Sequence, residues 1–218
     1  MASLVSYIDL NQKSLWIATA SIVFNPLWWN IVARQEYKNK ILTKAAFGNP
    51  YWGCYGLAVA IFSLGILRDH LYKEALLDQP THPFLHYTEV KIVAAVLFAV
   101  GGTLVVTSMW ALGVTGTYLG DYFGILMDHK VESFPFSVTS SPMYTGSTLS
   151  FLATALWYES PAGILLTFLV WLEYKIALRY EDPFTGEIYA KRDRERAAAK
   201  GKQTPTGKSS AIRAQGEL

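Results

Sequence analysis

The sequence predicts an all-α, polytopic integral membrane protein with about four to five membrane helices. The chain has 218 residues, of which 51% are hydrophobic, and its mean hydropathy is +0.21. Long stretches carry no charge, whereas the charged residues gather in connecting segments and in the C-terminal tail. Roughly 20 helical residues cross a bilayer, and several stretches approach that length. The net charge of +2 is too small to indicate a nucleic-acid partner.

The first apolar stretch extends from Ser14 to Ala33 and contains no charged residue. Asn25-Pro26 interrupts it, and Asn30 follows. One interpretation is a kinked crossing helix whose Asn side chains bond to the backbone groups that the proline frees. The other is an interfacial or re-entrant helix beside a functional site, because polar groups at membrane depth normally face protein or a cavity. Trp29 has the character of an interface anchor.

Two further spans are expected at Pro50 to Leu67 and at Ile92 to Leu112. A basic connector, Arg34 to Gly48, precedes the first of them, and a polar loop, Arg68 to Glu89, separates the two. The span from Ile92 carries small residues four apart, a spacing that lets another helix or a ligand approach the backbone closely. These residues are Ala95, Ala99, Thr103, Thr107 and Ala111.

The segment from Gly113 to Gly146 is the central loop, on which the predicted function depends. It is too polar for a membrane helix and contains many aromatic and acidic residues. Long loops inside compact proteins are usually functional or disordered, and disordered segments lack aromatic residues. We therefore expect this loop to build a reaction site at the membrane surface.

The region from Pro142 to Leu178 forms either a helical hairpin with its tip at Glu159-Ser160-Pro161 or one bent crossing. The hairpin obeys the positive-inside rule better, since it places the basic connector in the cytosol. It also brings the central loop and Glu181-Asp182 to the same cytosolic face. Residues 1–192 are then a membrane-embedded domain, and residues 193–218, which lack apolar periodicity, are a disordered basic cytosolic tail.

Several blocks of the sequence, in order from about Leu10 to Arg192, resemble the phosphatidylethanolamine N-methyltransferase family of phospholipid methyltransferases. The blocks are Phe24 to Pro26 with Trp29 to Arg34, Leu112 to Leu126, Phe134 to Phe136, Pro142 to Tyr144 with Gly146 to Thr148, and Tyr180 to Thr185. Within the family, Ile61 to Ile66 and Tyr174 to Arg179 make the chain most similar to the fungal phosphatidyl-N-methylethanolamine N-methyltransferases.

The resemblance implies an enzyme of phospholipid biosynthesis that uses S-adenosyl-L-methionine. It implies methylation of phosphatidyl-N-methylethanolamine and then of the dimethyl lipid to phosphatidylcholine, in the endoplasmic reticulum membrane and also in a mitochondrial membrane. The family's cofactor-binding Gly-x-Gly falls on Ala99-Val100-Gly101, where the leading glycine is replaced. The family's acidic pair falls on Glu181-Asp182, which keeps both charges. No zinc-ligand spacing occurs, so we expect no metal.

The chemistry that the resemblance implies fits these residue types. An amine must be neutral to attack a methyl group, so a carboxylate should take its proton. Asp121 and Glu181 are the catalytic candidates, and Glu181 and Asp182 can instead bind the cofactor. Aromatic faces attract sulfonium and methylated ammonium cations, which makes Tyr122 and Tyr144 candidates for substrate binding. Other aromatic residues that could contribute are Tyr118, Phe123, Tyr180 and Phe184.

Three alternatives remain open on the sequence. The enzyme could run all three methylations from phosphatidylethanolamine, as the broader family can. It could instead methylate a prenylated cysteine carboxylate, although a carboxylate acceptor needs no base and favours basic neighbours. A non-enzymatic membrane adaptor would bind no cofactor. The membrane phospholipid substrate is the only partner that the sequence indicates.

Overall fold

The computed structural model describes residues 7–128 and 131–202, and within these ranges its regular structure is entirely helical. The longer helices are α1 (Lys13–Asn39), α3 (Pro50–Leu77), α4 (Thr88–Thr117), α5 (Pro142–Trp157) and α6 (Pro161–Lys202). Three short helices join them: α2 (Ile41–Ala45), η2 (Pro83–His86) and η3 (Gly120–Phe123). Four helices of the described chain are long and apolar enough to cross a membrane, namely α1, α3, α4 with its extension, and α6. The predicted fold class is confirmed.

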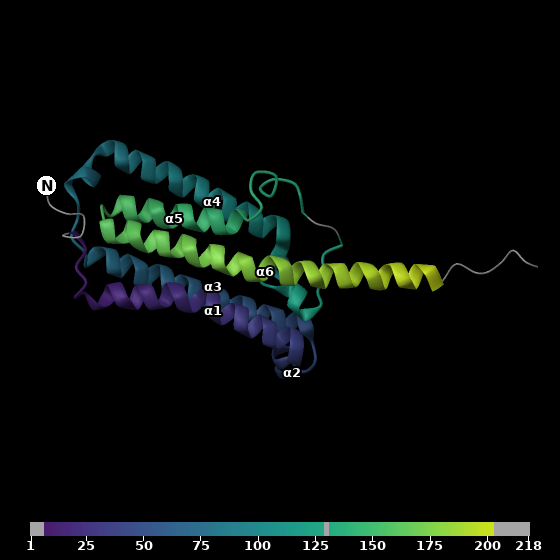
Figure 1. The fold of residues 1–218 in the computed structure, drawn as a ribbon. Helices are drawn as coiled ribbons and strands as arrows, with labels where there is room; N and C mark the ends of the chain where they lie inside the picture. Colours follow the sequence, from purple (N-terminus) through teal and green to yellow (C-terminus); the bar gives the residue numbers. More distant parts are fainter. Residues whose placement is uncertain (1–6, 129–130, 203–218) are drawn as a thin grey trace, which may run out of the picture. The chain divides into compact units, whose positions relative to one another are not determined.

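The chain divides into two compact units, Met1–Glu181 and Asp182–Leu218. The first unit contains α1 to α5 and the beginning of α6. In it, α1 lies along α3 and α4 lies along α5 (Figure 1). The second unit consists, as far as it is described, of the remaining length of α6.

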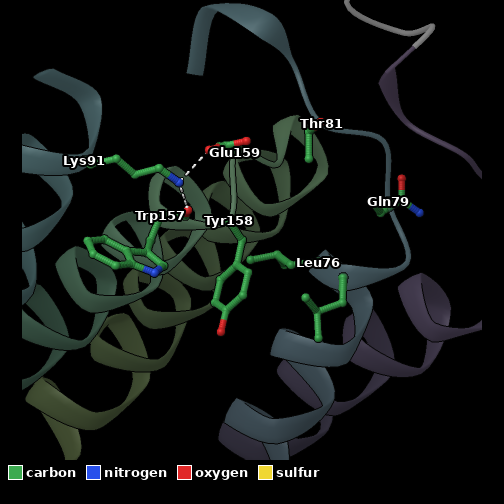
Figure 2. A pocket seen from close by; sticks show the side chains of 8 residues that line it. Leu76, Gln79, Thr81, Lys91, Trp157, Tyr158 and Glu159 are labelled. Carbon is green, nitrogen blue, oxygen red and sulfur yellow. Dashed lines mark hydrogen bonds and ion pairs between the residues drawn. The ribbon is translucent and has the colours of Figure 1, made fainter. Parts of the chain in front are cut away.

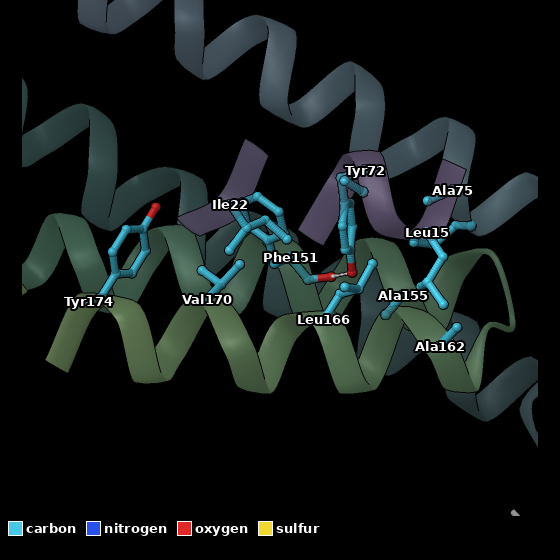
Figure 3. Packing of buried hydrophobic residues seen from close by; sticks show 12 residues of the cluster. Leu15, Ile22, Tyr72, Ala75, Phe151, Ala155, Ala162, Leu166, Val170 and Tyr174 are labelled. Carbon is cyan, nitrogen blue, oxygen red and sulfur yellow. Dashed lines mark hydrogen bonds between the residues drawn. The ribbon is translucent and has the colours of Figure 1, made fainter. Parts of the chain in front are cut away.

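The core of the first unit is built where α1, α3, α5 and α6 meet (Figure 3). Helix α6 contributes side chains four apart, such as Leu166, Val170 and Tyr174, so that they share one face of the helix. Tyr72 of α3 joins three helices, because its hydroxyl lies 3.0 Å from the carbonyl oxygens of both Phe151 and Gly163. A buried hydroxyl needs such partners, and here they fix the relative positions of the helices.

Helix α4 packs against α5 through two glycines. A Cβ added to Gly101 would lie 2.5 Å from the carbonyl oxygen of Gly146 and 2.7 Å from Ser150 Oγ. A Cβ on Gly146 would lie 2.5 Å from the carbonyl oxygen of Gly101. The two backbones therefore approach as closely as small residues allow. The buried face of α4 holds Ala94, Gly101, Leu104 and Ser108.

The predicted row of small residues is wrong as the packing face of α4. Ala95, Ala99 and Thr103 are exposed, and the hydroxyl of Thr103 bonds back to the Ala99 carbonyl. A strict four-residue repeat selects a neighbouring face of α4, whereas the contact with α5 is made where Gly101 and Gly146 meet. Two connections are also shorter than expected: α1 continues to Asn39 and α3 continues to Leu77.

The C-terminal hairpin is confirmed, because α5 and α6 are separate helices joined by a turn at Tyr158–Ser160. Its tip lies at Glu159, as predicted. Helix α6 continues through Lys202, so helix is found over 193–202, where we expected a disordered tail. The rest of that expected tail, residues 203–218, lies outside the described residues.

Candidate functional site

The carboxylate of Glu181 is the centre of a buried polar cluster in the first unit. Its side chain is 8% exposed. Oε1 accepts hydrogen bonds from Trp29 Nε1 at 2.9 Å and from Asn30 Nδ2 at 2.8 Å. Oε2 accepts a hydrogen bond from the Tyr144 hydroxyl at 2.6 Å. Three neutral donors from two other helices, α1 and α5, thus converge on one carboxylate.

Two aromatic side chains bond to this carboxylate, and two further aromatic residues contact Tyr144. The rings of Tyr144 and Tyr174 lie 4.7 Å apart, at an interplanar angle of 52°. The indole of Trp29 is held by its own bond to Glu181. Tyr122, from η3, is completely buried and close enough to the Tyr144 hydroxyl to interact with it electrostatically. Glu181, Tyr144 and Tyr122, all predicted site residues, therefore lie together.

The polar residues inside α1 explain how this helix supplies two of the donors. The helix continues across Pro26 to Asn39, which favours the crossing-helix interpretation. Asn25 Nδ2 donates to the carbonyl of Leu64 in α3 at 3.3 Å. Asn30 Nδ2 also donates to the Pro26 carbonyl at 3.0 Å. Trp29, expected as an interface anchor, is instead a partner of Glu181.

A second buried carboxylate, Glu36, shapes the end of the unit near η3. It is fully buried and accepts hydrogen bonds from the backbone N–H groups of Leu42 at 2.7 Å and Thr43 at 3.2 Å. The Thr43 hydroxyl also donates to it. These bonds satisfy orphan donors at the start of α2. Sequence reasoning gave Glu36 no such role, because in sequence it is one acid among the basic residues of the connector.

The elbow formed by α1 and α2 supports the turn that carries Tyr122. Lys40, which has a left-handed backbone conformation, directs its ammonium towards the Tyr122 carbonyl at 3.5 Å. Gly53 of α3 leaves room for this packing, since an added Cβ would lie 3.0 Å from the Phe123 ring and 3.2 Å from the backbone of Thr43. The basic connector and the start of the central loop thus lie at the same end of the unit.

The remaining predicted site residues do not join the cluster. Asp121 accepts a hydrogen bond from the Tyr122 N–H at 3.2 Å within η3. Ala99 and Val100 are exposed on α4, and Gly101 is covered by α5. Asp182 is exposed and begins the second unit. Of the two acids in the pair, Glu181 belongs to the first unit and is buried within it.

A buried arginine extends the polar network along α6. Arg68 Nη1 donates to the Tyr174 hydroxyl at 2.8 Å, and Ser147 Oγ lies 3.1 Å from the same hydroxyl. The charge of Arg68 is balanced by Asp69, with Nη2 and Oδ1 2.9 Å apart. The sequence predicts a polar loop from Arg68 onward, but Arg68 is buried within α3. It bonds to Tyr174, whose ring lies tilted against that of Tyr144.

Comparison with known proteins gives consistent results. Residues 90–192 match the family model described as "Phospholipid methyltransferase". The chain is 59% identical over 201 residues to a phosphatidyl-N-methylethanolamine N-methyltransferase of Neurospora crassa, covering 92% of this chain and 94% of that protein. It is 51% identical over 191 residues to the protein of that name in Saccharomyces cerevisiae, covering 88% and 92%.

The chain is also 47% identical over 189 residues to the phosphatidylethanolamine N-methyltransferase of Homo sapiens, with 87% of this chain and 94% of that protein covered. No solved structure matches. In the described part of the chain, no group of three or more His, Cys, Asp or Glu side chains could hold a metal ion.

Proposed function

Since the chain belongs to the phospholipid methyltransferase family, we propose that the Glu181 cluster is the place where this membrane enzyme methylates the amine of a phospholipid. The relatives are named for N-methylation of phosphatidylethanolamine or its monomethyl form. The product of the completed reaction is phosphatidylcholine. Neither a carboxyl methyltransferase nor an adaptor is among these relatives.

The observation that carries the proposal is the state of the Glu181 carboxylate. It is buried, yet among the described residues it forms hydrogen bonds only to neutral donors and has no ion pair. Burying a charge without a counter-ion is costly. A cationic ligand beside Glu181 would remove that cost, and the reaction has two cations to offer, a sulfonium and an ammonium.

The same cluster fits S-adenosyl-L-methionine, which when bound supplies an electrophilic methyl group on its sulfonium. Asn30 Oδ1 is buried and has no hydrogen-bond partner within the described residues. This orphan acceptor can take a hydrogen bond from an amino group of the cofactor. Glu181 and Asn30 are therefore the residues that would hold the cofactor.

The chain's own residues would then prepare the acceptor amine. A lipid ammonium must lose a proton before its nitrogen can attack, and Glu181 can take that proton directly or through a water molecule. Tyr144, hydrogen-bonded to Oε2, would hold the carboxylate in place during the transfer. The rings of Trp29, Tyr144 and Tyr174 would attract the cationic groups and exclude water. We assign Asp121 to positioning Tyr122 rather than to proton transfer.

We further propose that the preferred acceptors are the monomethyl and dimethyl lipids. The support is the aromatic enclosure with one carboxylate, together with the fungal relatives named for the monomethyl substrate. The end of the unit that carries Arg34, Lys38, Lys40 and Lys44 would face the cytosol, following the positive-inside rule. The endoplasmic reticulum membrane, with a mitochondrial membrane as a second location, is a prediction that cell fractionation would test.

Glu181→Gln tests the assignment, with the exposed Glu74→Gln as the matched control. We expect Glu181→Gln to lower the methylation rate by at least about a hundredfold, the lower range for loss of a general base. The purified variant should keep its elution profile and its thermal stability in detergent. Normal turnover and normal S-adenosyl-L-methionine affinity in Glu181→Gln would refute the proposal.

A further inference from the structure

The opposite end of the first unit, at the tip of the hairpin, has features that the proposed reaction does not use. Two hollows adjoin there and share Trp157 and Tyr158 as lining residues. One hollow, of about 250 Å³, has the polar side chains of Gln79, Lys91 and Glu159 among its lining residues. The positions of Tyr144 and Trp157 on α5 differ by about 20 Å along the helix axis, so these hollows are distant from the Glu181 cluster.

The second hollow is an apolar trough of about 350 Å³ between α4 and α5. Small side chains form much of it, because Ala94, Ala95 and Ala153 leave room that larger residues would fill. Phe98 closes one side and is 58% exposed. Since α4 is a candidate membrane span, we infer that this trough faces lipid, and its largely apolar lining suits an acyl chain.

A pair of opposite charges lines the first hollow, which adjoins the trough at Trp157 and Tyr158. Lys91 Nζ lies 2.6 Å from Glu159 Oε1, donates to the Trp157 carbonyl, and sits 5.5 Å from the Trp157 ring centroid (Figure 2). These bonds use two of the three donors of the ammonium. Glu159 Oε2 also faces His86 Nε2 at 3.0 Å. Lys91 is the last charge before the uncharged run of α4, the level at which lipid headgroups lie.

The backbone at Glu159 supports a role for its side chain. Its φ is 59°, a left-handed conformation that glycine or asparagine adopts at lower cost. The turn itself needs only that conformation, which Ser160 N–H and Glu159 N–H stabilise by bonding back to α5. A glutamate in this position adopts a backbone conformation that costs it more than it would cost glycine, which fits a function of the carboxylate.

We propose that the two hollows together form a binding site for one zwitterionic membrane phospholipid. Part of an acyl chain occupies the trough, the phosphate accepts the remaining donor of Lys91, and the headgroup amine approaches Glu159. The lysine and glutamate present the two charges that such a headgroup carries, in reversed sign. Trp157, whose side chain is 52% exposed, lies at the boundary where indole rings favour the interface. This site is separate from the Glu181 cluster and does not depend on the function proposed for it.

Photo-crosslinking of the full-length protein in lipid nanodiscs tests the site. The probes are diacyl lipids with a diazirine in one acyl chain: a phosphatidylethanolamine, a phosphatidylglycerol and a diacylglycerol. We expect phosphatidylethanolamine to label peptides around Lys91–Phe98 and Ala153–Tyr158, and diacylglycerol to label them far less. Lys91→Met should lower labelling by both phospholipids about tenfold, which is the loss of one charged hydrogen bond.

Two further variants separate the headgroup from the trough. Glu159→Gln should lower labelling by phosphatidylethanolamine but not by phosphatidylglycerol, which has no amine. Ala95→Leu, at an exposed position, should fill the trough and lower labelling by every probe, whereas Val106→Leu on the same helix should change nothing. Ala95→Leu should leave the methylation rate unchanged, because it is far from Glu181.

The proposal would be overturned if labelling were uniform along α4, including the region of Val106, and did not respond to Lys91→Met or Ala95→Leu. Such labelling would show only the ordinary lipid annulus. Labelling that Ala95→Leu abolishes but Lys91→Met leaves intact would overturn the headgroup assignment. Both results are independent of enzyme activity, so a failure here is distinguishable from a failure of the Glu181 assignment.

Discussion

Replacing Gly101 by alanine should weaken the packing of α4 on α5, and the neighbouring Gly102 offers a matched control. The new methyl carbon would lie 2.5 Å from the Gly146 carbonyl oxygen. Carbon and other heavy atoms prefer about 3.5–4.0 Å, so the helices would have to separate by about 1 Å. Such overpacking costs about 1–3 kcal/mol. At Gly102 an added Cβ meets nothing within 4 Å.

Both substitutions gain the same helix propensity, about 0.5–1 kcal/mol for Gly→Ala in a helix. This gain cancels when the two variants are compared. The free energy of unfolding of Gly101→Ala should therefore lie about 1–3 kcal/mol below that of Gly102→Ala. For a chain of this length, that difference corresponds to roughly 3–10 °C in Tm. Thermal unfolding of both purified variants in the same detergent would measure it.

Equal stability of the two variants would refute the close-packing argument. The measurement also bears on Ala99-Val100-Gly101 as the cofactor-binding segment, which the family resemblance implies. If Gly101→Ala keeps its Tm but loses affinity for S-adenosyl-L-methionine, then a ligand rather than α5 is what approaches Gly101. Loss of stability with unchanged affinity per folded molecule would assign Gly101 to helix packing. Gly65→Ala, with open space around the added Cβ, serves as a second control.

Three further predictions concern the two polar clusters. Tyr144→Phe removes the 2.6 Å hydrogen bond to Glu181. We expect the methylation rate to fall about tenfold, which corresponds to the loss of one hydrogen bond to a charged group. A rate within twofold of that of the parent protein would contradict this expectation. The hydrogen bond from Lys91 lowers the pKa of Glu159 below its ordinary value. The pair therefore stabilises the fold at pH values above that ordinary pKa, and this contribution is lost as pH falls through the lowered pKa. In Glu159→Gln the acid-side slope of Tm against pH should flatten, and an unchanged slope would argue against a stabilising Lys91–Glu159 pair. Cation–π attraction of about 0.5–2 kcal/mol predicts a roughly two- to thirtyfold preference for monomethyl over unmethylated lipid, and initial rates in matched micelles that show no preference would refute the aromatic enclosure.

The sequence was sufficient to predict the helical membrane fold and the C-terminal hairpin. Both follow from local signals: uncharged stretches of spanning length, and the break at Glu159-Ser160-Pro161. Helix ends were less predictable. Charged residues such as Arg68 suggested a loop, yet α3 continues to Leu77. The reason is that Arg68 satisfies its donors with Tyr174 and Asp69, and a partner 106 positions away leaves no local trace in a sequence.

The partners of Glu181 also could not be identified from the sequence. Asn30 and Trp29 were conspicuous in the sequence, since a polar residue within an apolar stretch usually faces protein or a cavity. That principle indicated that Asn30 had a partner without identifying it. The partner lies 151 positions further along the chain, and the packing of α1 beside α6 in the same direction brings the two together.

The two clusters lie at opposite ends of the same helices, and this arrangement has a physical cause. An apolar bundle can accommodate polar side chains most cheaply near its ends, where water and headgroups are within reach. Tyr72 and the aliphatic side chains of the core occupy the length between them. Glu36 and Glu181 are both enclosed rather than solvated, but the donors of Glu36 belong to the start of α2, whereas Glu181 lies beside an acceptor that has no partner among the described residues. A cationic, hydrogen-bonding ligand would offset the cost of burying the Glu181 carboxylate without a counter-ion and would pair the Asn30 oxygen. That combination, rather than the presence of an acid at the end of a membrane span, is our reason for proposing a binding site at Glu181.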